Sequence, residues 1–154
     1  MQTRSKTIMN LDFSDLLDLS RELDVLSRAE SHQAMRKATN AAATLLRDEI
    51  RTSAPRKTGK LARNIVTRNH RMRNKGEVSS GVYVRGSNAS GTNSDTSMKS
   101  DHPNNAFYWR FLEEGTSKMA PRPFIRPTFD RESDKAANLA ISELNRAIDE
   151  ALGK

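Results

Sequence analysis

The residues that most often perform catalysis are few in this sequence, and their spacing does not suit it. The three histidines, His32, His70 and His102, stand far apart, and none lies in a metal-binding spacing such as H-E-x-x-H. Cysteine is absent, which excludes disulfides, thiolate nucleophiles and cysteine-ligated zinc. Neither a G-x-S-x-G elbow nor a phosphate-binding G-x-x-x-x-G-K-[ST] loop is present. We therefore expect no enzymatic activity, no metal and no cofactor.

One pair of carboxylates, Glu113 and Glu114, is adjacent in the chain. Neighbouring side chains on a helix or strand do not converge on one atom, so they form a poor acid–base pair. We expect a structural role instead, either as a helix cap or in ion pairs with Arg122 or Arg126.

Basic residues are concentrated in the middle of the chain, which carries a net charge of +7 and has a pI of about 10.0. Residues 50–76 contain no acidic residue, so this stretch is a candidate for contact with phosphates. It holds almost no aromatic residues, which limits the expectation to sequence-independent DNA contact. A solvated basic face remains the alternative. The candidate DNA-contact residues are Arg56, Lys57, Lys60, Arg63, Arg68, Arg71, Arg73 and Lys75.

The composition predicts one domain with a small core. The 154 residues suit one domain over residues 1–154, yet only 35% are hydrophobic and 5% aromatic, with a mean hydropathy of -0.76. Such a chain either completes its burial against partners or is an ordinary hydrophilic domain. No apolar run approaches the ~18 residues that span a bilayer, and the first ten residues contain no signal-peptide core.

Helical spacing marks the N-terminal part, after a tail or edge strand at residues 1–10. Ser14 can cap a first helix, whose apolar stripe is Leu16, Leu19, Leu23 and Leu26. Ser31 can cap a second helix that runs to about residue 53 and ends before Pro55. The expected inner face of the second helix is Ala34, Ala38, Ala42, Leu45, Leu46 and Ile50.

The middle of the chain predicts an antiparallel hairpin. Residues 64–73 and 77–85 are rich in β-branched and aromatic types, with a turn at residues 74–76 between them. A polar stretch rich in Ser, Asn, Thr and Gly follows over residues 86–105, and we expect a flexible loop there.

The C-terminal part predicts a short helix, an arm and a long helix. Residues 106–114 favour a helix over a strand, with Gly115 at its C-terminal end. Pro121, Pro123 and Pro127 stiffen an extended arm over residues 119–127, and Pro127 can also lie in the first turn of a helix that runs to about residue 152. We therefore predict an α+β fold in which the long helices pack on a small antiparallel sheet. The expected stripe of the last helix is Ala137, Ala140, Ile141, Leu144, Ala147, Ile148 and Ala151.

Two segments together carry a family resemblance: residues 54–61, A-P-R-K-T-G-K-L followed by Ile65, and residues 108–127, Y-W-R-F-L-E-E-G-T-S-K-M-A-P-R-P-F-I-R-P. In this order they resemble the HK97 gp10-like family of phage tail components, related to minor tail protein Z of lambda-type phages. The resemblance spans about residues 10–152. The chain departs from the family pattern at Trp109 and Glu114, where a small residue and an aromatic residue are usual, and in the close spacing of Pro121 and Pro123.

The resemblance implies a structural virion protein of the neck or tail end that is required for head–tail joining or tail completion. It implies assembly in the host cytoplasm into a ring around the DNA channel, as a hexamer or alternatively a dodecamer, stacked on other neck, connector, tail-terminator or tail-tube proteins. We expect the arm, anchored by Phe124, to dock on a neighbouring subunit; the alternative is an arm that covers its own core. The expected subunit-interface residues are Thr58, Gly59, Leu61, Glu113, Gly115, Thr116, Pro123, Phe124 and Pro127.

Overall fold

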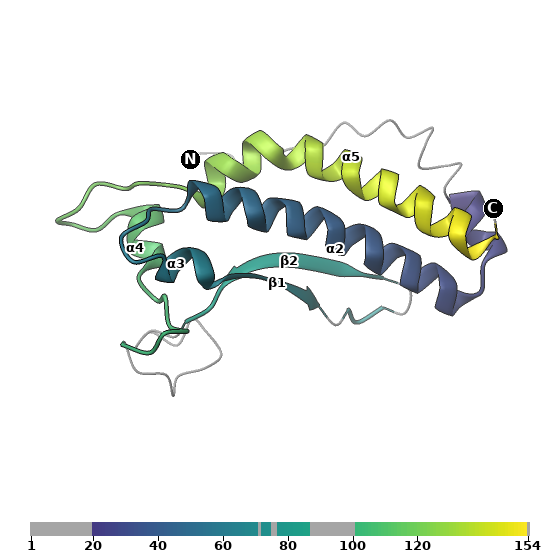
Figure 1. Ribbon diagram of the computed structural model, residues 1–154, viewed down its shortest axis with the longest axis horizontal. Helices are drawn as coiled ribbons and strands as arrows, with labels where there is room; N and C mark the ends of the chain where they lie inside the picture. The colour runs from purple at the N-terminus through teal and green to yellow at the C-terminus, as the bar shows by residue number, and fades with distance from the viewer. Residues whose placement is uncertain (1–19, 71, 75–76, 87–100, 154) are drawn as a thin grey trace.

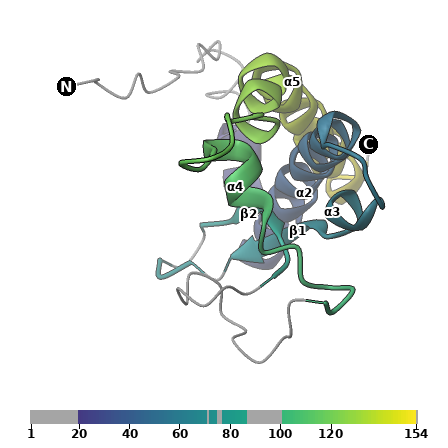
Figure 2. The same ribbon diagram turned by 90° about the vertical axis from the view of Figure 1, so that its left-hand side faces the viewer.

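Two long helices and a β-hairpin form an elongated three-layer arrangement in the computed structural model, which describes residues 20–70, 72–74, 77–86 and 101–153. Helix α2 lies between helix α5 and the hairpin, while the short helices α3 and α4 lie at one end (Figures 1 and 2). The predicted α+β fold is confirmed. The elements are α2 (Arg28–Ser53), α3 (Lys60–Arg63), β1 (Ile65–His70), β2 (Ser79–Val84), α4 (Trp109–Glu114) and α5 (Ile125–Ala151).

Helix α2 begins at a capping box formed by Ser27 and Glu30. The Glu30 amide donates to the Ser27 hydroxyl at 3.3 Å, and the Ser27 amide donates to the Glu30 carboxylate at 3.0 Å. The prediction of Ser31 as the cap was wrong, because the Ser31 hydroxyl donates to the carbonyl of Leu23 instead. The helix ends at Ser53, before Pro55, as predicted.

The segment before α2 is helical over residues 20–25. Leu23 and Leu26 of the predicted stripe pack against the N-terminal end of α2 and the C-terminal end of α5. Ser14, Leu16, Leu19 and residues 1–10 lie outside the described residues.

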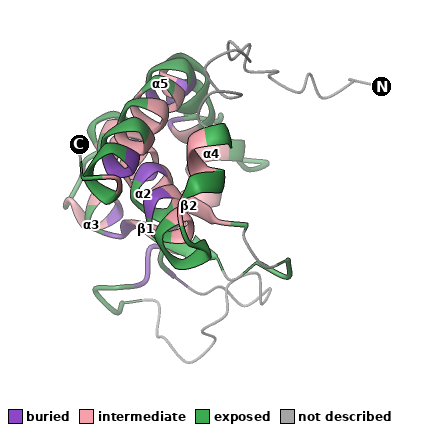
Figure 3. Cartoon of the chain, turned by 90° about the vertical axis from the view of Figure 1, so that its right-hand side faces the viewer, coloured by how far each residue is buried: buried purple, intermediate pink, exposed green. Residues whose placement is uncertain are grey.

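The core consists of two clusters at opposite ends of the α2–α5 pair. One cluster surrounds Ala34, Ala147 and Ile148, and the other contains residues of α2, α3 and β1 together with Phe124. Along most of α5 and much of α2, the residues that face away from the core are exposed (Figure 3). The second cluster comprises Ile50, Ala54, Leu61, Ile65, Ala106 and Phe124.

The hairpin pairs Ile65 with Val84 and His70 with Ser79 in antiparallel register. Both strands are shorter than predicted, and Arg71, Lys75 and Gly76 of the expected strand end and turn lie outside the described residues. One face packs on α2, where the Ser80 hydroxyl is hydrogen-bonded to Thr39 at 3.1 Å.

Asn64 ties the chain after the polar stretch back to the hairpin. Its buried side-chain amide donates to the carbonyls of Lys60 and Pro103, at 2.8 Å each. The amide of Ala106 also donates to the carbonyl of Arg85 at 3.0 Å. Residues 101–106 are therefore fixed in position, whereas residues 87–100 of the expected loop lie outside the described residues.

The C-terminal elements differ from the prediction at their boundaries. The short helix α4 is confirmed but begins at Trp109, because residues 106–108 form a turn. Helix α5 begins at Ile125, so the extended segment before it ends at Phe124. Pro127 lies in the first turn of α5, where the backbone amide that proline lacks would have no hydrogen-bond partner within the helix.

Candidate interaction site

Glu113 joins α4 to the beginning of α5. Its carboxylate accepts hydrogen bonds from the backbone amides of Phe124, Ile125 and Arg126 at 2.7, 3.0 and 2.9 Å. These amides have no partner within the helix, and a negative charge is favourable at a helix N-terminus. The expectation that Glu113 has a structural capping role is thus confirmed, through backbone amides and not through an arginine side chain.

Gly115 makes the tight corner after α4. Its φ of 75° lies in the region that favours glycine, and its amide donates to the carbonyl of Phe111 at 2.9 Å. A Cβ atom here would lie 2.8 Å from the nitrogen of Pro121 and 2.9 Å from the carbonyl oxygen of Met119. Only glycine therefore allows the arm to fold back this closely.

The arm, residues 116–123, is held by backbone hydrogen bonds although its side chains are exposed. Thr116 and Met119 exchange two backbone hydrogen bonds, at 2.9 and 3.3 Å, which close a small hairpin. The amide of Arg122 donates to the carbonyl of Leu112 at 2.7 Å, so the returning chain is fixed to α4. Residues 116–123 are all exposed, and they project beyond the end of α5 (Figure 1).

Phe124 anchors the arm to its own chain. Its side chain is only 3% exposed and belongs to the same core cluster as Leu61. For these two side chains the structure favours the alternative in which the arm covers its own core. A subunit-interface role for them and for Pro127, which is exposed on the first turn of α5, stays a prediction.

The turn at Thr58 and Gly59 borders a basic pocket of about 480 Å³. Gly59 has a φ of 74°, and the Thr58 hydroxyl accepts a hydrogen bond from the amide of Lys60 at 3.3 Å. The pocket brings both motif segments together, since α4 and the arm contribute to its wall. Burial raises the pKa of the Tyr108 phenol, which also lines the pocket. The basic lining residues are Arg56, Lys57, Lys60 and Arg122.

The other candidate DNA-contact residues do not line this pocket. Arg63 and Arg73 are exposed, and Arg68 lies 5.7 Å from the ring centre of Tyr83 on the hairpin face that points away from α2. There the Tyr83 hydroxyl is hydrogen-bonded to His70. Arg71 and Lys75 lie outside the described residues.

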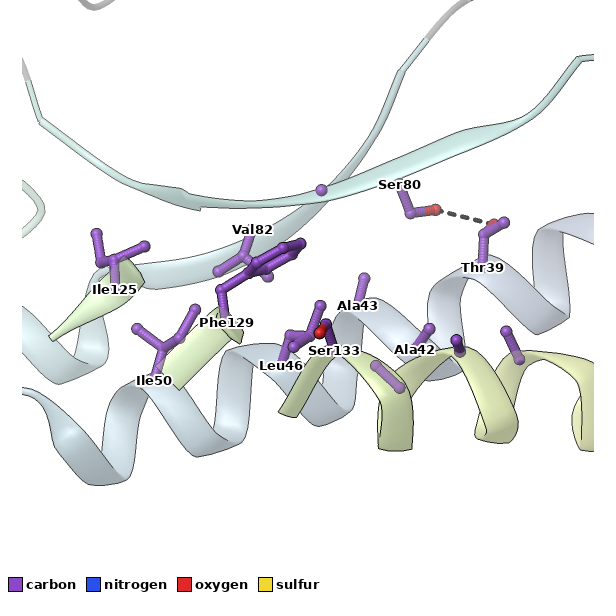
Figure 4. A pocket seen from close by; sticks show the side chains of 14 residues that line it. Thr39, Ala42, Ala43, Leu46, Ile50, Ser80, Val82, Ile125, Phe129 and Ser133 are labelled. Carbon is purple, nitrogen blue, oxygen red and sulfur yellow. Dashed lines mark hydrogen bonds between the residues drawn. The ribbon is translucent and has the colours of Figure 1, made fainter. Parts of the chain in front are cut away.

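A groove of about 360 Å³ runs along α2 between the hairpin and α5 (Figure 4). No charged side chain lines it, and Phe129 at its edge is 44% exposed. Ala42, Leu46 and Ile50 were expected on the inner face of α2, but no groove was predicted. The spacing of Ile125, Phe129 and Ser133, four residues apart, was the signal in the sequence that these side chains lie on one face of α5. The lining residues are Thr39, Ala42, Ala43, Leu46, Ile50, Ser80, Gly81, Val82, Ile125, Phe129, Ser133, Ala136, Ala137 and Ala140.

Within the described residues, no group of three or more His, Cys, Asp or Glu side chains is placed to hold a metal ion. In the same part of the chain, no helix is long and apolar enough to cross a membrane.

Comparison with known proteins gives one match. The family model HK97-gp10_like, described as "Bacteriophage HK97-gp10, putative tail-component", matches residues 18–115. The matched range includes the T-G-K-L turn, the hairpin and the capping Glu113. No curated protein and no solved structure matches the chain.

Proposed function

The chain belongs to the HK97-gp10-like family of bacteriophage tail components, and on this premise we propose that it is a structural protein that completes the tail or joins it to the head. In this proposal the protein carries out no catalysis. It contributes a defined surface that other virion proteins recognise.

The observation that carries this proposal is an arm that is both exposed and rigid. Residues 116–123 are exposed, yet the Thr116–Met119 hydrogen bonds, the Gly115 corner and the Glu113 cap hold them in place. A segment that is already ordered loses little conformational entropy when it binds. This combination suits a docking element, because a rigid segment that only covered its own core would bury its side chains.

We further propose that copies assemble into a ring around the DNA channel, as a hexamer or alternatively a dodecamer. The arm projects at one end of an elongated molecule, so contact through it joins different surfaces of neighbouring copies. Contacts between different surfaces build a ring when the rotation between copies closes. The ring would be built in the host cytoplasm and stay in the virion, against neck, connector, tail-terminator or tail-tube proteins.

The test is a null allele of this gene in the phage that carries it. We expect filled heads and separate tails in electron micrographs, restored to joined particles when the gene is supplied from a plasmid. Mass spectrometry of purified wild-type virions should detect the polypeptide. Normal infectious tailed particles from the null allele would refute the proposed role.

The basic pocket supports a second candidate, sequence-independent contact with the phage DNA. Arg56, Lys57 and Arg122 line it and form no ion pair with any described residue. Cationic side chains without protein partners are available to phosphates.

Salt dependence tests this candidate. Each phosphate contact contributes about 0.9 to the slope of log K against log salt concentration, so an Arg56→Glu/Lys57→Glu variant should weaken binding and reduce the slope. The control is Arg36→Glu/Lys135→Glu, which makes the same charge change at exposed positions outside the pocket. Equal losses in both variants would indicate a general charge effect and refute a pocket-specific contact.

A further inference from the structure

We propose that the groove between α2, the hairpin and α5 receives the arm of a second copy of this chain, an inference that rests on the proposed function. The groove is lined by uncharged residues of α2, the hairpin and α5 (Figure 4). The arm, residues 116–123, is the exposed segment best suited to fill it.

The sizes of the two surfaces agree. The α2 wall of the groove runs from Thr39 to Ile50, which at about 1.5 Å of rise per residue is roughly 16 Å. Five extended residues span about 16–18 Å, and the part of the arm after its hairpin turn, residues 119–123, has five. The small side chains of Ala42, Ala43 and Gly81 leave room for a chain to lie close to the backbone.

The chemistry of the two surfaces also agrees. Met119, Ala120 and Pro121 present a continuous uncharged surface, and the groove lining has no charged side chain. Arg122 is the one charged residue among residues 119–123, so its side chain has to stay at the edge of the groove, because an unpaired buried charge is costly. Methionine adapts its shape to irregular apolar surfaces, which favours Met119 as the inserted side chain.

Charge complementarity indicates a second copy as the occupant. The arm carries Lys118 and Arg122 on either side of its apolar residues. On α5, the exposed Asp130 and Asp134 directly follow the lining residues Phe129 and Ser133 and form no ion pair with a described residue. Opposite charges beside an apolar contact set its orientation more than its strength.

An arm cannot occupy the groove of its own chain. The Arg122–Leu112 hydrogen bond and the Gly115 corner hold it against α4, and it points away from the groove, beyond the end of α5 (Figure 1). Each copy therefore offers an arm to one neighbour and a groove to another. Head-to-tail contacts of this kind have no two-fold axis, and they close into a ring when the rotation from one copy to the next divides a full turn.

Thiol cross-linking tests the contact, because the chain has no native cysteine. Purified Met119→Cys and Ala137→Cys chains are mixed and treated with a short thiol-to-thiol cross-linker, so that any mixed product joins two copies. The matched control replaces Ala137→Cys by Lys135→Cys, an exposed residue of the same helix that does not line the groove. Thermal melts of each variant show that it is folded.

We expect a cross-linked dimer from the Met119→Cys and Ala137→Cys pair and none from the control pair. In parallel, Met119→Asp should abolish the oligomer in sedimentation velocity, while Met72→Asp, the same change at a methionine that is 39% exposed and lies outside the arm and the groove, should leave it intact. Oligomers that persist in Met119→Asp, or equal cross-linking in both pairs, would overturn the arm-in-groove contact and leave the ring untouched. A chain that stays monomeric at high concentration without cross-linking would overturn the contact as well. The proposed role in the virion is judged separately, by the null allele.

Discussion

Replacing Glu113 by alanine removes the cap of α5, and the loss can be estimated from the structure. The carboxylate accepts three backbone amides at 2.7–3.0 Å. Loss of a helix cap costs about 0.5–2 kcal/mol, and the charge at a partly buried helix N-terminus adds up to about 2 kcal/mol. Together these give a loss of about 0.5–4 kcal/mol. Because three amides lose their acceptor at once, we expect Glu113→Ala to lower the free energy of unfolding by an amount in the upper half of this range, about 2–4 kcal/mol.

Urea unfolding followed by circular dichroism measures this change, at a concentration where sedimentation shows a monomer. Since about 1 kcal/mol shifts Tm by roughly 2–4 °C in a chain of this length, Tm should fall by about 4–16 °C. Glu113→Gln keeps one acceptor oxygen and should lose less stability than Glu113→Ala.

Glu114→Ala is the matched control. The Glu114 side chain is exposed and makes no hydrogen bond among the described residues, so this variant should change the free energy of unfolding by less than about 0.5 kcal/mol. Equal effects of Glu113→Ala and Glu114→Ala would refute the capping role.

Three further changes test other parts of the structure. Gly115→Ala should destabilise the chain more than Gly59→Ala: both sites have positive φ, but a Cβ at Gly115 lies within 3 Å of the arm backbone, whereas nothing lies within 4 Å at Gly59. Comparable midpoints in urea for the two variants would contradict this. Phe124→Ala should cost the monomer about 3–5 kcal/mol because it opens the core; an unchanged melt would place the side chain outside the core. Glu30 has a pKa lowered from its ordinary value of 4.5, chiefly by its backbone hydrogen bond with Ser27, so its stabilisation is present above pH 4.5 and is lost as pH falls through the lowered pKa. The stability difference between wild type and Glu30→Gln should therefore shrink in acid, and a difference independent of pH would exclude this linkage.

The elements could be predicted from the sequence because their signals are local. Apolar spacing, Pro55 and the β-branched residues placed the two long helices and the hairpin correctly. The cap of α2 was misplaced because Ser27 and Ser31 are chemically alike, and the deciding interaction, the bond from Ser31 to Leu23, depends on how residues 20–26 pack.

The site was predictable only in part, because its contacts join distant segments. The sequence indicated that Glu113 has a structural role, but its partners lie 11 to 13 residues further along the chain. Phe124 was expected to anchor the arm, yet only the three-dimensional structure places it beside Ile50 and Leu61. The spacing of Ile125, Phe129 and Ser133 indicates one wall of the groove, but the groove also depends on the separation of α5 from the hairpin, which that spacing does not determine.

The exposed arm, residues 116–123, is separate from the residues that fold the protein, so the proposed contact with a neighbour uses residues outside the core. Residues 116–123 belong to neither core cluster, so most changes there should leave the fold intact. Under the proposed arm contact, substitution or recombination within residues 116–123 would change the choice of partner without unfolding the protein. A chimaera that carries another family member's arm between Gly115 and Phe124 should keep its own scaffold and acquire that member's assembly preference.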